Sequence, residues 1–298
     1  MVAPTVISTF AGCGGSSLGY KMAGFKELLA VEWDDNAVET FRLNFPDVPV
    51  YHGDIKKLSG KECMGLAGIG PDELDVLDGS PPCQGFSTAG KRRFDDPRNG
   101  LFGEFARLLG ELRPRVFVME NVTGLVMGHM KQVYLMMMEE FRSKGYRCRG
   151  EILNAKYYGV PQSRERVIVI GVRGDLRIEP SHPRPQTRPL SVESVVPEEK
   201  GKKYVTFRNK GGGLKNSWTS SSNPLPVIMK GGGVEYYQKS RAHVPLGVLK
   251  ACSSFGTEFK FAGTDQDVID RIGNSVPPNL MRAIAEHIRD ELLISNTP

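Results

Sequence analysis

The chain has 298 residues, of which 40% are hydrophobic and 24% charged, and a net charge of +5, an ordinary composition for a globular protein of one large domain or about two domains. It contains no run of about 18 apolar residues and no signal-peptide pattern at its N-terminus. We therefore expect no membrane association and an intracellular location, in the cytoplasm or nucleoid of a microbial or viral source or in a nucleus.

Five cysteines are scattered along the chain without a CxxC pair, which argues against a disulfide framework and against a zinc site. We expect no metal.

Short apolar runs alternate with helical patterns up to about residue 172. This alternation predicts β/α units and a mostly parallel sheet, and hence an α/β fold. The expected strands lie at 5–10, 27–33, 75–80, 115–121 and 166–172, and the expected helices at 35–44, 100–112 and 129–144.

The stretch FAGCGGSSLG, residues 10–19, follows the first expected strand and opens a helix. Such a glycine-rich turn lets a cofactor lie against backbone at a helix N-terminus, although any tight turn favours glycine. Glu32 ends the next strand about 20 residues later, where an acid can accept hydrogen bonds from ribose hydroxyls. Asp54 could meet an adenine ring. Taken singly, either acid could instead cap a helix, and Trp33 could be a core aromatic.

The stretch DGSPPCQGFS places Cys83 after two prolines at the end of an apolar run. Proline restricts its own backbone and that of the preceding residue, so the cysteine is held stiffly, as suits an attacking group. Glu120 ends the expected strand 115–121, and parallel strands would bring it to the same sheet edge. No histidine lies in a neighbouring motif, so the pair does not resemble a protease site.

Arg164 and Arg166 come just before the expected strand 167–172. Alternate residues of a strand point the same way, so both guanidinium groups can face the cleft and donate to a carbonyl or a phosphate. Alternatively, they pair with Glu165 and with surface acids.

Residues 179–190 contain four prolines and no periodicity, which indicates a linker. The following stretch is rich in Gly, Ser, Asn and Lys, so we expect a small β-rich or irregular domain over 179–271. Residues 201–250 hold nine Lys and Arg and a single acid, a local net charge of +8 that leaves −3 for the other 248 residues. This segment suits phosphate-backbone binding, or it is a solvated basic face.

Leu280, Ile284, Ile288 and Leu292 recur at four-residue intervals near the C-terminus. Their apolar stripe predicts a helix that docks on the first sheet. The larger domain would then be discontinuous, comprising 1–178 and 272–298.

Six motifs together resemble the cytosine-5 DNA methyltransferases in order and rough spacing: FAGCGG, GDI, PPCQGFS, ENV, QSRER and GNSVPP. The resemblance covers nearly the whole chain apart from about 175–242. It implies a Rossmann-like, S-adenosylmethionine-dependent domain that releases S-adenosylhomocysteine, and a smaller target-recognition domain. It also implies double-stranded DNA in the cleft between them, with the target cytosine flipped out. We expect a monomeric modification enzyme.

The resemblance assigns roles to the candidate catalytic residues. Cys83 matches the nucleophile that adds to cytosine C6 and so activates C5 for methylation. Glu120 matches the acid that engages ring N3 and the exocyclic amine. Arg166 matches the residue that binds cytosine O2, and Arg164 supports the site.

Cofactor and nucleic-acid contacts are implied in the same way. The loop after Cys83 has three glycines and the run KRR, which suits a mobile lid over the DNA. The cofactor residues are Phe10, Gly12, Cys13, Gly14, Glu32, Trp33, Asp54, Ile55, Pro82, Leu101 and Asn274. The nucleic-acid residues are Gln84, Ser87, Lys91, Arg92, Arg93, Lys210, Lys230 and Arg241.

The chain also departs from the family pattern. Gly256 stands where proline is usual and Val227 where threonine is common, so the target sequence stays open. Two other functions fit the same motifs: a transfer-RNA cytosine-5 methyltransferase, and a DNA-binding protein of this fold without activity.

Overall fold

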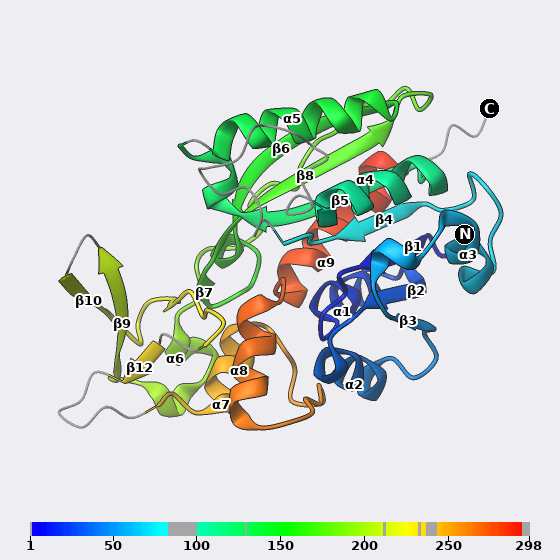
Figure 1. Ribbon diagram of the computed structural model, residues 1–298. Coiled ribbons are helices and arrows are strands. Elements are labelled where there is room, and N and C mark those ends of the chain that lie inside the picture. The colour runs from blue at the N-terminus through cyan, green and yellow to red at the C-terminus, as the bar shows by residue number, and fades with distance from the viewer. Residues whose placement is uncertain are drawn as a thin grey trace.

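The computed structural model in Figure 1 describes residues 2–82, 100–128, 130–210, 213–231, 234–236 and 243–293. A large sheet with its helices occupies the upper and right-hand part of the view. A smaller region of short strands and helices lies at the lower left.

The large sheet has seven strands in the order β3-β2-β1-β4-β5-β8-β6. The first five are parallel, whereas β8 runs antiparallel to both β5 and β6. This confirms the α/β fold with a mostly parallel sheet. The antiparallel β8 begins beside the end of β5. The strands are β1 Thr5–Thr9, β2 Lys26–Glu32, β3 Val50–His52, β4 Val76–Gly79, β5 Val116–Val122, β6 Tyr146–Asn154 and β8 Glu165–Arg173.

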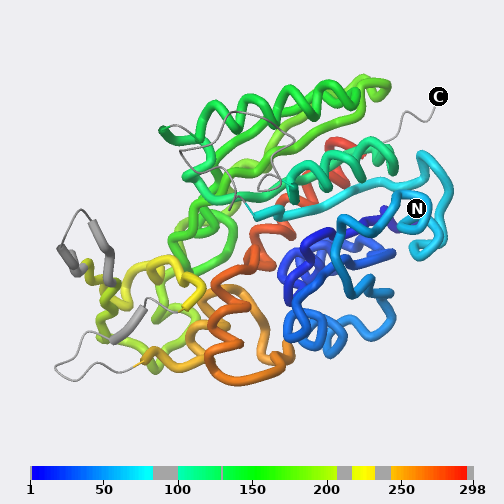
Figure 2. The backbone as a smooth tube through the Cα atoms, in the orientation of Figure 1, coloured from blue at the N-terminus to red at the C-terminus, as the bar shows by residue number. Residues whose placement is uncertain are grey.

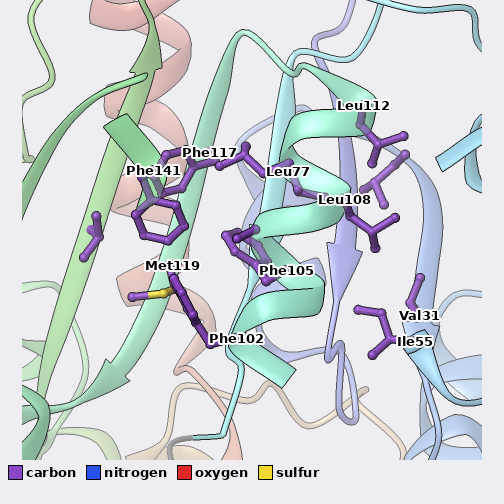
Figure 3. Close-up of a cluster of buried hydrophobic side chains, with 14 of the residues drawn as sticks. Val31, Ile55, Leu77, Phe102, Phe105, Leu108, Leu112, Phe117, Met119 and Phe141 are labelled. Atoms are coloured by element: carbon purple, nitrogen blue, oxygen red, sulfur yellow. The ribbon is translucent and has the colours of Figure 1, made fainter. Parts of the chain in front are cut away.

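Helices cover both faces of this sheet. The buried side chains of α4 recur every three or four residues, so they lie on one face of the helix, and this face packs against the core. Figure 3 shows this cluster, where the Phe105 and Phe117 ring centroids are 6.0 Å apart and those of Phe117 and Phe141 4.4 Å. Each buried ring stabilises the fold by about 1.5–3 kcal/mol. The helices of this face are α3 Gly60–Ala67, α4 Gly100–Leu112 and α5 Met130–Ser143.

The opposite face is covered by α1 (Gly15–Met22) and α9 (Pro278–His287), which continues as a π-helical turn, Ile288–Leu292. A Cβ on Gly19 would lie 2.6 Å from Met281 Cβ, so glycine permits the close approach of α1 to α9. Figure 2 shows the red C-terminal segment beside the blue N-terminal units. The apolar stripe expected near the C-terminus is buried here: Leu280, Ile284, Ile288 and Leu292.

The smaller region contains an antiparallel sheet of three strands, β10-β9-β12, and a parallel pair of very short strands, β7 and β11. A third core cluster joins its helices to α2 through Phe41, Phe45 and Phe259. Helix α2 spans Asp35–Asn44, between β2 and β3 of the large sheet. The elements of the smaller region are β7 Gln162–Ser163, α6 Val192–Val195, β9 Lys203–Lys210, β10 Gly213–Ser220, β11 Leu225–Pro226, β12 Val234–Tyr236, α7 Leu246–Cys252 and α8 Asp265–Asn274. Short 3-10 turns lie at Ile55–Lys57, Thr123–Val126, Ala155–Tyr157 and Pro197–Glu199.

Candidate active site

A cavity of about 1010 Å³ lies beyond the carboxyl ends of the parallel strands, the usual ligand position in such sheets. Its walls come from the ends of β1, β2, β4 and β5, the start of β8, and two later segments, 228–230 and 271–276. Of the residues singled out in the sequence, the following line it: Phe10, Gly12, Cys13, Glu32, Trp33, Asp54, Ile55, Pro82, Leu101, Glu120, Arg164, Arg166, Lys230 and Asn274.

The turn after β1 contributes backbone to the cavity. Phe10 has a φ of 54° and Gly12 a φ of 57°, in the left-handed region that is strained for phenylalanine and relaxed for glycine. A Cβ on Gly12 would have nothing within 4 Å, so this wall is open backbone. Gly14 differs, because it does not line the cavity and a Cβ there would lie 2.5 Å from the Phe45 ring. Its glycine permits packing of the turn against Phe45.

The carboxylate of Glu32 accepts three backbone hydrogen bonds. Gly12 N–H donates to Oε2 at 2.8 Å, while the N–H groups of Trp33 and Asp34 donate to Oε1 at 2.8 and 3.0 Å. These bonds fix the orientation of the carboxylate in the cavity wall. Trp33 is 77% exposed, so it is no core aromatic and presents a ring at the cavity. The Asp54 side chain accepts from Lys56 N–H and therefore caps a 3-10 turn as well as lining the cavity.

Glu120 and Arg166 form an ion pair inside the cavity, with Arg166 Nε 2.8 Å from Glu120 Oε1. Both side chains are largely buried, at 8% and 12% exposure. Sheet geometry explains the pair: Glu120 lies near the end of β5, and antiparallel pairing sets Arg166 opposite Val122. Among the described residues, the carboxylate partner of Arg166 is Glu120 and not the expected Glu165 or a surface acid; Nη1 of Arg166 donates to the backbone oxygen of Glu165.

Arg164 lies two residues earlier but has different contacts. Its Nη1 donates to the Ile228 carbonyl at 2.9 Å, and its Nη2 donates to the carbonyls of Gly273 and Ser275 at 2.8 Å. Burial lowers the pKa of its guanidinium to about 9, and the neighbouring Arg166 charge adds to this shift. The group still carries its proton at neutral pH. The sequence prediction that both arginines donate to a bound group therefore fits Arg166 better, since Arg164 donates to the protein backbone.

Arg271 is a cavity residue that sequence reasoning missed. Its Nη1 and Nη2 lie 3.0 Å from Oδ1 and Oδ2 of Asp34. Asp34 also caps α2 by accepting from Ala37 N–H at 2.9 Å. Burial acts to raise the pKa of Asp34, but the Ala37 N–H and the Arg271 charge outweigh it and hold this pKa below its usual range. The sequence did contain one indication of this role: Arg271 lies one helical turn before Asn274, which was predicted to contact the cofactor.

Cys83, the expected nucleophile, lies outside the described residues. The chain is described up to Pro82, which lines the cavity, and Asn121 Nδ2 donates to the Pro81 carbonyl at 2.9 Å. The hydrogen bond therefore anchors the chain two residues before the cysteine, and the cavity lining extends to the residue that precedes it. Other predicted residues outside the described part are Gln84, Ser87, Lys91, Arg92, Arg93 and Arg241. Lys210 is described only as backbone of β9, and Lys230 is exposed at the cavity.

Fold and cavity together define an α/β protein with a ligand site at the strand ends. Residues 4–243 and 247–290 match the family model of the C-5 cytosine-specific DNA methylases. The chain is 34% identical to the Type II methyltransferase M1.HphI of Haemophilus parahaemolyticus, over 95% of this chain and 86% of that protein. It is 31% identical to the Type II methyltransferase M.Sau96I of Staphylococcus aureus, over 95% and 75%. A prophage-encoded protein from E. coli shares the fold, with a TM-score of 0.77 at 23% identity over 98% of this chain and 100% of that one.

The chain thus belongs to the C-5 cytosine-specific DNA methylase family. It is an enzyme, a DNA cytosine-5 methyltransferase, as the motifs predicted. The RNA alternative is not favoured by these relatives. Among the described residues, no cluster of three or more His, Cys, Asp or Glu could hold a metal ion. None of the helices described there is long and apolar enough to span a membrane.

Proposed function

We propose that this enzyme methylates C5 of a cytosine flipped out of double-stranded DNA, using S-adenosylmethionine, as the modification enzyme of a Type II restriction-modification system. The observation that carries the proposal is the Glu120–Arg166 ion pair, which lines the same cavity as the carboxylate of Glu32. One space can thus hold both a cofactor and an extruded base. We further propose that the enzyme acts as a monomer, with a catalytic domain formed by 1–178 and 272–298 and a target-recognition domain over 179–271.

The residues around Glu32 fit S-adenosylmethionine. The carboxylate of Glu32 suits ribose hydroxyls, and the exposed Trp33 ring, which lines the same cavity as Ile55, suits a flat adenine. Gly12 leaves open backbone where the methionine part would lie. When bound, this cofactor supplies an electrophilic methyl group. The remaining proposed contacts are Phe10, Cys13, Asp54, Pro82, Leu101 and Asn274, with Gly14 shaping the turn.

Glu120 and Arg166 fit the polar edge of a cytosine. A guanidinium can donate to O2, while a carboxyl group can engage N3 and the exocyclic amine. Their 2.8 Å contact holds the two groups side by side, preorganised for that edge. In the proposed reaction the Cys83 thiolate adds to C6, and the carboxyl group of Glu120 donates a proton to N3, where negative charge would otherwise develop. After C5 is methylated, C5 loses its proton and the bond from C6 to Cys83 breaks.

DNA binding is proposed for the basic segment 201–250 and the loop after Cys83. Flipping a base costs a few kcal/mol, which contacts to the flanking phosphates must offset. Lys230, exposed at the cavity rim, is the described residue of this group that lies nearest the proposed chemistry. The dissociation constant for DNA should therefore rise steeply with salt, and a salt-independent value would contradict this assignment.

A covalent trap tests the mechanism. The enzyme is mixed with S-adenosylmethionine and mixed-sequence DNA or RNA containing 5-fluorocytosine, whose C5 has no proton to lose. We expect a denaturation-resistant adduct with DNA for the wild type and none for Cys83→Ala, although this variant should still bind DNA. An adduct that persists in Cys83→Ala would overturn the nucleophile, and an adduct on RNA alone would overturn the substrate.

A further inference from the structure

The last turn of α8 connects three segments of the cavity wall. Through its guanidinium, Arg271 pairs with both carboxylate oxygens of Asp34, in the turn after β2. Through its carbonyl, it accepts a hydrogen bond from Ser275 Oγ at 2.6 Å. Ser275 Oγ in turn lies 3.0 Å from Cys13 Sγ, in the turn after β1. The turns after β1 and β2 and the segment after α8 therefore meet at Arg271.

Asp34 links this arginine to the proposed ribose acid. Its N–H donates to Glu32 Oε1 at 3.0 Å, beside the N–H of Trp33 at 2.8 Å. Any displacement of the Asp34 backbone therefore changes the donors that orient the Glu32 carboxylate. Arg271 is 12% exposed and Asp34 37%, so water screens the pair in part, and its bidentate geometry fixes the Asp34 side chain. A guanidinium fork matches both oxygens of one carboxylate, which an ammonium group cannot do.

We propose that Arg271 is a positioning residue for the cofactor site, acting through Asp34 to hold the Glu32 carboxylate in the geometry that binds the cofactor. This inference rests on the proposed function, in which Glu32 binds the ribose of S-adenosylmethionine. It assigns a role to a residue outside the motifs that carry the family resemblance.

The neighbouring residue of α8 provides a matched control. Asp270 accepts from Gly231 N–H at 2.9 Å and from Gln266 Nε2 at 2.8 Å, so it holds the segment after Lys230 and not the turn after β2. Asp270→Asn removes one charge from the same helical turn as Arg271→Gln does. The two substitutions remove different interactions: Asp270→Asn weakens the contact with Gly231, whereas Arg271→Gln removes the ion pair with Asp34.

The test measures binding of S-adenosylhomocysteine to the full-length enzyme by calorimetry, without DNA. We expect Arg271→Gln to weaken binding about ten-fold, Arg271→Lys to lie between it and the wild type, and Asp270→Asn to stay within about two-fold. Asp34→Asn keeps a good helix cap but removes the ion pair. Combining it with Arg271→Gln should weaken binding no further than the more damaging single change.

Steady-state kinetics separate positioning from general damage. The KM for S-adenosylmethionine should rise in Arg271→Gln while kcat at saturating cofactor stays within about two-fold, since Arg271 is not placed at the reacting atoms. Thermal unfolding checks that each variant is folded; if Arg271→Gln is not, Arg271→Lys and Asp34→Asn carry the same comparison. Unchanged binding in these variants, or additive effects in the double variant, would overturn the inference alone. A wild type that fails to bind would overturn the cofactor assignment itself.

Discussion

Two groups of carboxyl side chains have opposite surroundings: one lines the cavity, and the other lies between α1 and the sheet. Those that line the cavity have strong donors: Glu32 accepts three backbone N–H groups, and Glu120 pairs with Arg166 at 2.8 Å. These partners hold both carboxyl groups in fixed orientations where a ligand would bind.

The acids between α1 and the sheet, Glu27 and Asp78, have neutral partners. Ser17 Oγ donates to Glu27 Oε1 at 2.9 Å, and Tyr20 Oη lies 3.4 Å from Asp78 Oδ1. Burial raises the pKa of Glu27 to about 7, against the weaker effect of the serine hydroxyls. Burial also raises the pKa of Asp78 well above its usual range, and the charges of Glu27 and Glu120 add to the shift. The fold thus gives the acids of its ligand site backbone and guanidinium donors, whereas the acids under α1 have hydroxyl partners and raised pKa values.

The largest expected effect concerns the cavity pair. Glu120→Gln keeps the shape of the side chain and one acceptor oxygen. It removes the carboxyl group that can give up and take back a proton. We expect kcat to fall about 10²–10⁴-fold, the usual contribution of a general acid or base, while the melting temperature changes little. Methyl transfer from labelled S-adenosylmethionine to DNA measures the rate. A variant with more than a tenth of the wild-type rate would remove Glu120 from the chemistry.

Variants of Arg164, which precedes β8, and of Arg166, which lies in it, should affect stability and activity differently. Arg164→Met leaves three backbone carbonyls without their donor, so we expect a loss of about 3 kcal/mol in the free energy of unfolding. Arg166→Lys keeps a cation beside the buried Glu120 but loses the guanidinium fork, so it should cost about 1 kcal/mol in stability but most of the activity. Urea unfolding and methyl-transfer assays on both variants measure the difference. Equal losses of stability would contradict the distinction between them.

The sequence predicted the elements whose pattern is local. The helices expected at 35–44 and 100–112 occur at those residues, because the spacing of their apolar residues lies within each element. Strand β6 (146–154) was not predicted, since charged residues interrupt it at the sheet edge. The antiparallel direction of β8 was also missed, because strand direction depends on pairing and not on local pattern.

The same limit applies to the site. Glu120 and Arg166 could be proposed because each lies at a strand end within a recognisable motif. The pair of Asp34 and Arg271 could not, since its members are 237 residues apart and meet only through tertiary packing. Position 14 of the motif is a glycine because the Phe45 ring lies beside it and leaves no room for a Cβ. This reason cannot be seen in the sequence.

The smallest expected effect concerns the buried acids and depends on pH. The ordinary pKa of Glu27 applies in the unfolded chain and a value of about 7 in the folded one, so folding takes up a proton between these limits. The contribution of Glu27 to the free energy of unfolding is therefore greatest below the ordinary pKa of glutamate. It falls as the pH rises to about 7 and is constant above that pH. Glu27→Gln cannot take up this proton.

Urea unfolding at pH 5 and pH 8 measures this effect. Relative to the wild type, Glu27→Gln should be more stable at pH 8 than at pH 5, its free energy of unfolding being larger by about 2 kcal/mol. Ser17→Ala provides the opposing control, because loss of its hydroxyl donor destabilises the carboxylate and should extend the fall in stability to higher pH. Parallel pH profiles for all three proteins would mean that Glu27 is charged in the folded state, and the contrast between the two groups of acids would not hold.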